Sequence, residues 1–386
     1  MKKILFVVDE NRMGGVSILL EDMMKMINRK NKKIDILVLH NSGDRLKNLP
    51  NGVNVIYGSH YFDSVDLPMK EIIKSKSIKN LIRKFILVFD MKTGLIKYKI
   101  KRERKKILKE NYDIEVAFKD GFTAIFTMFG DSTKKIHWLH YDYNQANPNA
   151  KYSKLFNQIL PKFDNIIAVS KGIMDDFNKI YRLEEKTQVI SNLIDINKIK
   201  NKSLDFERKK EKKLEIISVG RLHCMKGYDR FINAINRLRT DKLINKVSFK
   251  IYGDGPEKEN LTNLINKLGL NGIVTLEGKV DNPYVYMKDS DLFVLSSLYE
   301  PFGLVIIEAL TLGVPVLATQ NSATDKLIND EINGLIVDNS EEGIYKGLKR
   351  ILKDQQCLMK LKENSKKFDY SSENKKILKE LQDLFC

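Results

Sequence analysis

Two glutamates bracket the most informative stretch of the sequence. Glu300 precedes the loop Pro301-Phe302-Gly303, and Glu308 lies in the apolar run that begins at Leu304. Residues 291–296 are typical of a buried strand, so Glu300 should follow a strand's carboxyl end and Glu308 should lie in the next helix. Backbone N–H groups around residues 302–304 would suit a diphosphate, and the carboxylates could accept hydrogen bonds from sugar hydroxyls.

Arg221 and Lys226 lie in a second loop, between a predicted strand at residues 214–219 and a predicted helix that starts at Tyr228. Gly220 allows a tight turn directly after the strand. Arginine can bind a diphosphate through two parallel hydrogen bonds, and lysine adds a point charge. The pair therefore suits a departing nucleoside diphosphate, although two solvated surface cations are an alternative interpretation.

The N-terminal half offers Gly14, Gly15 and His140. The two glycines follow the first predicted strand and would let the backbone approach a phosphate or a sugar. Their spacing is not the GxGxxG pattern of dinucleotide-binding proteins. His140 ends another predicted strand and could hydrogen-bond a sugar or phosphate, although a lone strand histidine is more often structural.

No pattern in the sequence predicts a metal or a cofactor. Asp289 and Asp291 resemble a metal-binding DxD pair, but Asp291 opens an apolar strand, which favours a role at the strand boundary. The cysteines number three and lack metal-ligand spacing, which favours a reducing cytoplasm. The sequence contains no HExxH motif, P-loop or nucleophile elbow.

Apolar strands alternate with helical segments along the whole chain, which is typical of a doubly wound α/β fold. The predicted strands lie at residues 4–8, 34–39, 53–57, 114–118, 135–140, 165–170, 214–219, 249–252, 274–277, 291–296, 314–318 and 334–337. A chain of 386 residues is long enough for two domains. We predict a Rossmann-like domain over residues 1–185, a second over 186–365, a ligand cleft between them, and a C-terminal helical segment over 366–386.

The net charge of +17 and the isoelectric point near 9.4 favour an anionic partner. Residues 70–109 interleave lysines and arginines with isoleucine, leucine and phenylalanine, a pattern typical of basic amphipathic helices that bind anionic membranes. Solvated lysines over ordinary core helices are the alternative. Because no apolar run is long enough for a signal peptide or a membrane span, we expect a cytoplasmic protein, peripheral at the inner face of the cell membrane.

Several of these features occur together and in order. They are Gly14-Gly15, His140, Gly220-Arg221 with Lys226-Gly227, Gly253-Asp-Gly-Pro256, and Glu300-x7-Glu308. The constellation resembles the GT4 family of retaining glycosyltransferases, which have the two-domain GT-B fold. The resemblance extends over essentially the whole chain and is strongest at residues 216–337. It implies that the C-terminal helix crosses back to the first domain.

The resemblance also implies roles for individual residues. Arg221 and Lys226 would hold the donor's diphosphate and stabilise its charge as it leaves, so that no metal is required. Glu308 would accept hydrogen bonds from the ribose, and the backbone around Lys279 and Val280 would lie near the base.

The sugar of the donor would be held from both domains. Glu300 would face it, together with the backbone N–H groups near Phe302, Gly303 and Leu304. Gly15 would approach the diphosphate from the first domain, and His140 would contact the sugar.

We therefore predict transfer of a hexose or N-acetylhexosamine from a nucleotide diphosphate sugar to a saccharide acceptor. A UDP-sugar is the first choice of donor, followed by GDP-mannose. A lipid-linked acceptor at the inner leaflet, in the synthesis of a bacterial surface polysaccharide, would explain the basic tract. Two other classes stay open: a nucleotide-sugar epimerase or NAD-linked α/β enzyme, and a nucleic-acid-binding protein, which the charge alone suggests and no recognition motif supports.

Overall fold

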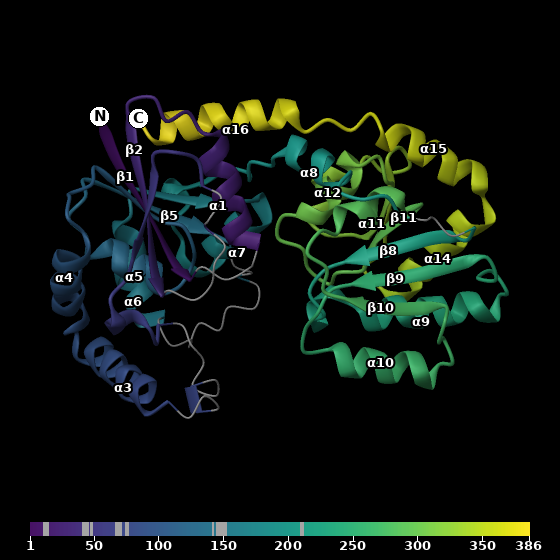
Figure 1. Cartoon of the computed structure of the whole chain (residues 1–386), viewed down its shortest axis with the longest axis horizontal. Coiled ribbons are helices and arrows are strands. Elements are labelled where there is room, and N and C mark those ends of the chain that lie inside the picture. Colours follow the sequence, from purple (N-terminus) through teal and green to yellow (C-terminus); the bar gives the residue numbers. More distant parts are fainter. Residues whose placement is uncertain are drawn as a thin grey trace. The chain divides into compact units, whose positions relative to one another are not determined.

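The structure is a computed structural model of the whole chain, and it describes residues 1–10, 15–40, 46, 49–65, 72–73, 77–140, 143, 153–208 and 212–386. The chain forms two compact units (Figure 1). The first comprises Met1–Ile194 together with Asn374–Cys386, and the second comprises Asp195–Glu373.

The described part of the first unit contains a seven-stranded parallel sheet in the order β3-β2-β1-β4-β5-β6-β7. Its strands are β1 (Lys2–Glu10), β2 (Lys32–His40), β3 (Val53–Tyr57), β4 (Ile114–Ala117), β5 (Lys134–Leu139), β6 (Asn165–Ala168) and β7 (Thr187–Val189). Its longer helices are α1 (Gly15–Met26), α3 (Ile78–Thr93), α4 (Ile96–Ile107), α5 (Phe122–Met128), α6 (Ser153–Ile159), α7 (Lys171–Tyr181) and α16 (Ser371–Leu384). Residues 4–7 of β1 are completely buried, because a central parallel strand is covered on both faces.

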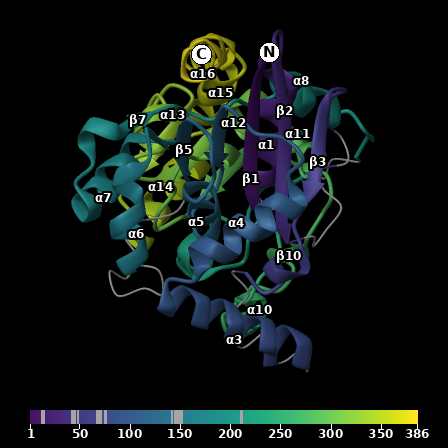
Figure 2. The same cartoon turned by 90° about the vertical axis from the view of Figure 1, so that its left-hand side faces the viewer.

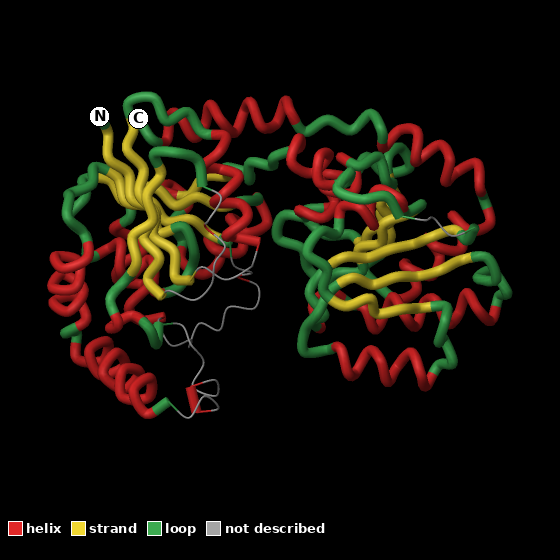
Figure 3. The backbone as a smooth tube through the Cα atoms, viewed as in Figure 1, coloured by secondary structure: helices red, strands yellow, loops and turns green. Residues whose placement is uncertain are grey.

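The second unit contains a six-stranded parallel sheet in the order β10-β9-β8-β11-β12-β13, with helices on both sides (Figure 3). Its strands are β8 (Leu214–Val219), β9 (Val247–Tyr252), β10 (Val274–Gly278), β11 (Leu292–Leu295), β12 (Val316–Thr319) and β13 (Gly334–Val337). Its helices are α8 (Ile196–Lys202), α9 (Tyr228–Thr240), α10 (Lys258–Lys267), α11 (Tyr284–Asp289), α12 (Leu304–Thr311), α13 (Thr324–Leu327), α14 (Glu341–Lys353) and α15 (Gln355–Ser365). The predicted pair of doubly wound domains is confirmed.

Two segments near the ends of the units show how the chain is divided. β7 pairs with β6, so residues 187–189 form an edge strand of the first sheet, and the first unit continues beyond the predicted boundary at residue 186. Asn374 of α16 bonds both backbone groups of Ile194, at 3.1 and 2.8 Å. The ring of Phe385, directly after α16, lies 5.7 Å from that of Phe6 in β1, so the end of the C-terminal helix packs against the first unit. Figure 2 shows α16 nearly end-on, with the C-terminus near the N-terminus.

The aspartates of the DxD-like pair stabilise the second unit. Asp291 precedes β11, and its carboxylate accepts a hydrogen bond from the backbone N–H of Glu215 at 2.9 Å. It also pairs with Lys362 at 3.1 Å, while Asp289 lies 3.6 Å from Arg208. These contacts agree with the predicted role of Asp291 at the strand boundary.

Candidate functional site

The predicted donor-binding residues of the second unit lie at one edge of its sheet. Arg221 and Lys226 follow β8, Lys279 and Val280 follow β10, and Glu300 follows β11. All pairings in this sheet are parallel, so the carboxyl ends of these strands share one edge. In an open α/β sheet this edge is where ligands bind.

Lys226 and Glu300 form a direct ion pair at this edge. The Lys226 Nζ lies 2.7 Å from Glu300 Oε2, and the two side chains are only 25% and 11% exposed. The hydroxyl of Ser297 lies 3.5 Å from the same carboxylate oxygen. The structure thus joins a predicted diphosphate ligand and a predicted sugar ligand in one place, which sequence reasoning did not foresee.

The backbone around Lys226 is hydrogen-bonded to the loop after β11. Ser296 Oγ donates to the carbonyl of Lys226 at 2.8 Å, and the N–H of Leu298 donates to the carbonyl of Met225 at 2.9 Å. Gly227 follows with a φ of 61°, and a Cβ there would lie 2.3 Å from the carbonyl oxygen of Ser296. Only glycine fits this position, so the glycine helps to place Lys226.

We expect Gly227→Ala to lower the free energy of unfolding by about 1–3 kcal/mol, since it adds a backbone clash to an unfavourable φ. Chemical denaturation would measure this change. Gly272→Ala is the matched control, because Gly272 also has a positive φ (74°) but open space where its Cβ would be. Equal losses in the two variants would mean that the contact with Ser296 is unimportant.

Arg221 lies in a loop that is held through its backbone. Gly220 N–H donates to Tyr252 O at 2.9 Å, and Leu222 N–H donates to Asp254 O at 3.0 Å. Gly253 packs so closely on this loop that a Cβ there would lie 1.8 Å from the Gly220 carbonyl oxygen. The Arg221 side chain is exposed, and no ion pair engages it among the described residues. Its guanidinium is therefore accessible to a ligand from solvent.

Glu308 lies in α12 and is held by a residue that sequence reasoning missed. The hydroxyl of Tyr284, at the start of α11, donates to Glu308 Oε1 at 3.0 Å. Tyr284 is buried, and 24 residues separate it from Glu308. No local pattern marked this tyrosine, because its importance comes from the packing of α11 against α12.

We expect Tyr284→Phe to lower kcat/KM for the donor by about 3–10-fold, because losing one hydrogen bond to a carboxylate costs about 1 kcal/mol. Steady-state kinetics would measure the effect. Tyr286→Phe, on the same helix, is the control and should leave kcat/KM unchanged. If both variants behave alike, Tyr284 does not orient Glu308.

The loop between Glu300 and Glu308 ends in an uncapped helix start. Phe302 is buried, and Gly303 adopts a φ of 80° directly before the first residue of α12, Leu304. No side chain caps this helix, so its first backbone N–H groups are open to an anion. Lys279 is exposed and Val280 is half-buried, directly beyond β10.

In the first unit, His140 directly follows β5 and is held by Asp120. Its backbone N–H donates to Asp120 Oδ2 at 2.8 Å, while Asp120 Oδ1 lies 3.6 Å from His137 Nε2 and accepts a hydrogen bond from Tyr143. Asp120 is a second residue that sequence reasoning missed. Gly15 begins α1 after β1, and Gly14 lies outside the described residues.

Burial lowers the pKa of His140 to about 4; the carboxylate of Asp120 opposes this shift, and His137 and Lys119 each add a smaller lowering. His140 is therefore a neutral imidazole at pH 7. It can donate or accept a hydrogen bond there but adds no positive charge.

This shift gives a pH-dependent stability. Because the folded pKa lies below the usual 6.5 of histidine, the unfolded state binds the proton more readily, and protonation favours unfolding. We expect stability to be full above about pH 6.5 and to fall toward pH 4, by at most about 3 kcal/mol. Denaturation of wild type and His140→Gln across this range would measure it, and parallel curves would contradict the assignment.

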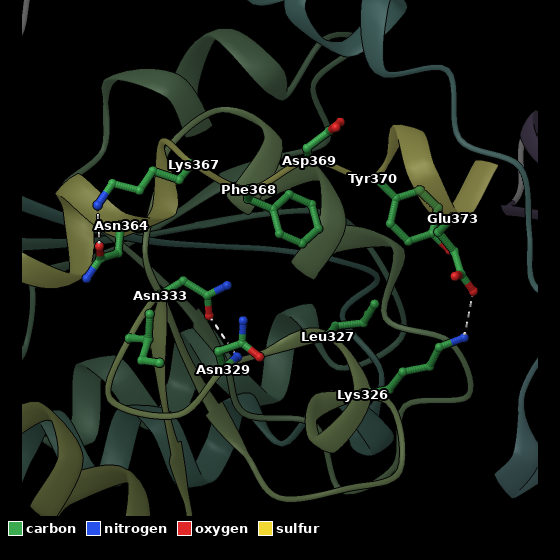
Figure 4. Close-up of a pocket in the computed structure, with 11 residues that line it drawn as sticks. Lys326, Leu327, Asn329, Asn333, Asn364, Lys367, Phe368, Asp369, Tyr370 and Glu373 are labelled. Carbon is green, nitrogen blue, oxygen red and sulfur yellow. Dashed lines mark hydrogen bonds and ion pairs between the residues drawn. The ribbon is translucent and has the colours of Figure 1, made fainter. Parts of the chain in front are cut away.

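A separate cavity of about 390 Å³ lies elsewhere in the second unit (Figure 4). It is lined by Lys326, Leu327, Asn329, Ile332, Asn333, Asn364, Lys367, Phe368, Asp369, Tyr370 and Glu373. None of the predicted donor-binding residues contributes to it. Within the described ranges, no cluster of three or more histidine, cysteine or acidic side chains could hold a metal ion.

Residues 199–368 match the family described as Glycosyl transferases group 1. The match runs from α8 to just beyond α15 and contains every donor-site residue of the second unit. The predicted resemblance is therefore confirmed for this part of the chain.

Curated relatives match over part of their length. The N-acetylgalactosamine-N,N'-diacetylbacillosaminyl-diphospho-undecaprenol 4-alpha-N-acetylgalactosaminyltransferase of Campylobacter jejuni is 34% identical over 229 residues, which cover 58% of this chain and 60% of that protein. The lipopolysaccharide core biosynthesis glycosyltransferase LpsE of Rhizobium meliloti is 34% identical over 149 residues, 38% of this chain and 42% of that protein. The chain thus spans three fifths or less of the length of these two relatives.

Solved structures match over the full length. Anabaena HepE in complex with UDP and glucose aligns with a TM-score of 0.70 at 19% identity, covering 99% of this chain and 100% of that one. S. aureus TarM, as a variant in complex with fondaparinux, alpha-GlcNAc-glycerol and UDP, aligns with a TM-score of 0.73 at 16% identity, covering 100% of both chains. These likenesses confirm the predicted GT-B fold class.

Proposed function

Because residues 199–368 form a domain of the glycosyl transferases group 1 family, we propose that the protein is a retaining glycosyltransferase that uses a nucleotide diphosphate sugar, most simply a UDP-sugar. The ion pair between Lys226 and Glu300, beside the uncapped start of α12, carries this proposal. It sets a cation for the diphosphate next to a carboxylate for the sugar. UDP in the complexes of HepE and TarM supports the choice of base.

In the proposed reaction, an acceptor hydroxyl oxygen forms a bond to the sugar's anomeric carbon as the bond from that carbon to the diphosphate breaks. The hydroxyl proton is released to a phosphate oxygen or to water, and the diphosphate leaves with the electron pair of the broken bond and so with additional negative charge. Lys226, the guanidinium of Arg221 and the N–H groups at the start of α12 stabilise that charge, in place of a metal ion. Full turnover after chelation of metals would support this part of the proposal.

The remaining residues orient the donor. Glu308, held by Tyr284, accepts hydrogen bonds from the ribose hydroxyls, and the backbone at Lys279 and Val280 flanks the base. Glu300 is engaged by Lys226, which favours a role in holding the sugar over attack on its anomeric carbon. The neutral His140 and Gly15 would contribute from the first unit.

For the acceptor, we propose a saccharide, lipid-linked, in the synthesis of a bacterial surface polysaccharide, with a hexose or N-acetylhexosamine as the transferred sugar. The name of the C. jejuni relative includes a diphospho-undecaprenol-linked saccharide, which supports a lipid-linked acceptor. The protein would then work as a peripheral protein at the inner face of the cell membrane. Among the described residues, no helix has the length and apolarity to cross a bilayer.

A thermal-shift panel with UDP, GDP, ADP and NAD, run on wild type and Arg221→Ala, would test the proposal. A ligand at about 100 times its dissociation constant adds about 2.7 kcal/mol of stability. Stabilisation by UDP that is lost in Arg221→Ala would support the assignment of donor and site. Stabilisation by NAD alone would move the protein to the dehydrogenase or epimerase class and refute the proposal.

A further inference from the structure

Helix α3 of the first unit exposes five of its large apolar side chains, whereas its buried residues are Leu87 and the charged Lys84 and Asp90. Lys84 and Asp90 are only 2% and 3% exposed, on the face that packs against the unit. The opposite face carries five apolar side chains that are 43–72% exposed, which we call the apolar ridge: Ile78, Ile82, Phe85, Ile86 and Phe89. Their spacing places them on one side of the helix. This is the reverse of a helix that simply covers a core.

Polar contacts fix this orientation. Lys84 Nζ donates to the carbonyl of Ser64 at 2.9 Å, and the hydroxyl of Tyr61 donates to Asp90 Oδ2 at 2.7 Å. Arg83 adds an ion pair with Asp63 at 2.7 Å. Rotating the helix to bury the ridge would break these contacts and leave charged groups without partners, which is costly. The exposure of the ridge is therefore built into the fold.

The ridge continues into a strongly basic surface on α4. Residues 78–109 contain twelve lysines and arginines but only two acidic residues, Asp90 and Glu103, and both acids are buried. The exposed cations of α4, which we call the basic face, are Lys97, Lys101, Arg102, Lys105 and Lys106. Leu95, 43% exposed, lies between the ridge and the basic face along the chain, and Tyr98, 64% exposed, lies among the cations of the basic face. The exposed charge of this region is thus entirely positive.

The position of α3 relates the ridge to the candidate site. Its polar partners, residues 61–64, come just after the carboxyl end of β3, and His140 comes just after the carboxyl end of β5. Because the sheet is parallel, both lie toward the same edge. Figure 2 shows α3 at that end of the first unit.

We propose that the apolar ridge and the basic face form one docking surface for an anionic phospholipid bilayer. The ridge inserts among the acyl chains while the basic face binds lipid phosphates, which is how amphipathic helices bind at a membrane interface. Exposed apolar and positive groups side by side match a surface that has an apolar interior beneath negative headgroups. The docking surface adds a membrane partner to the proposed function and rests on that function, because docking at this edge would bring a lipid-linked acceptor to the first unit.

Vesicle flotation of the full chain tests the surface. We expect wild type to bind vesicles of phosphatidylglycerol and phosphatidylcholine, and not phosphatidylcholine alone. Phe85→Ser/Phe89→Ser should lose most of this binding. In Lys101→Glu/Lys105→Glu the affinity for vesicles should fall by at least roughly fivefold for each lysine replaced. The matched controls are Met359→Ser and Lys258→Glu/Lys267→Glu, exposed positions on the second unit that should keep full binding.

Insertion itself can be measured with Phe85→Trp, because the native Trp138 is fully buried. Lipids brominated on their acyl chains should quench the new tryptophan and leave Trp138 unquenched. No quenching, or vesicle binding that persists in both ridge and basic-face variants, would overturn the proposal. So would a wild-type dimer in solution that Phe85→Ser/Phe89→Ser turns into a monomer without vesicle binding, since the ridge would then join two copies of the chain.

The outcome can be separated from that of the glycosyltransferase proposal. Phe85→Ser/Phe89→Ser should keep its stabilisation by UDP, because the ridge residues belong to the first unit, whereas Arg221, Lys226, Glu300 and Glu308 belong to the second. Vesicle binding without any nucleotide effect would refute the proposed reaction and leave the docking surface standing. Nucleotide binding without vesicle binding would refute the docking surface and leave the proposed reaction standing.

Discussion

Lys226→Ala should lower kcat by about 10²–10³-fold, which is the usual cost of removing one preorganised group that stabilises developing negative charge. The same change leaves the buried carboxylate of Glu300 without its cation, so the free energy of unfolding should also fall, by about 1–3 kcal/mol. Release of UDP from the donor would measure the first effect and chemical denaturation the second.

A double variant separates these two effects. Adding Glu300→Gln to Lys226→Ala removes the unpaired charge, so stability should recover while activity stays low. Lys258→Ala, an exposed lysine of α10, should change neither quantity. A Lys226→Ala enzyme with near-normal kcat would show that the diphosphate is bound elsewhere.

Arg221→Ala should lower kcat/KM by about 10²–10³-fold for the same electrostatic reason. Here the free energy of unfolding should change by less than about 0.5 kcal/mol, because the side chain is exposed and its loop is held through the backbone of Gly220 and Leu222. Steady-state kinetics and denaturation of the same preparation would measure both quantities.

Arg221→Lys is the matched variant for the arginine. It keeps the charge but loses the paired donors, so it should recover only part of the activity. Full activity in Arg221→Lys would mean that the charge alone is used. A large loss of stability in Arg221→Ala would mean that the arginine has a structural role instead.

The strands and the loops of the site were predictable because their signals are local. A strand buried on both faces is continuously apolar over four or five residues, as at residues 4–8 and 292–295, and this pattern can be read without knowing the neighbouring strands. Gly303, whose φ is 80°, likewise marks the start of α12 in the sequence. The position of Glu300 and Glu308 on either side of that turn follows directly.

The contacts of the site residues were not predictable, because they join distant parts of the chain. Lys226 and Glu300 are 74 residues apart, and His140 and Asp120 are 20 apart. β7 likewise belongs to the first sheet, because its pairing with β6 depends on the path of the chain between them. Local patterns carry no information about such partners.

In helix α3, too, one property was predictable from the sequence and another was not. The spacing of its apolar residues predicted an amphipathic helix, but periodicity says only which side chains share a face. The polar partners of Lys84 and Asp90 hold the charged face inward and leave the apolar face exposed, and these partners come from residues 61–64, outside the helix.

The amino-acid sequence alone determined the alternation of strands and helices and the residue types at the strand ends, since both depend on near neighbours in the chain. The tertiary structure decided which strand ends meet: β8 lies between β9 and β11, so the loops of Arg221, Lys226 and Glu300 share one edge. Strand order is a property of long-range pairing, and it is therefore what turns separate polar residues into one candidate site.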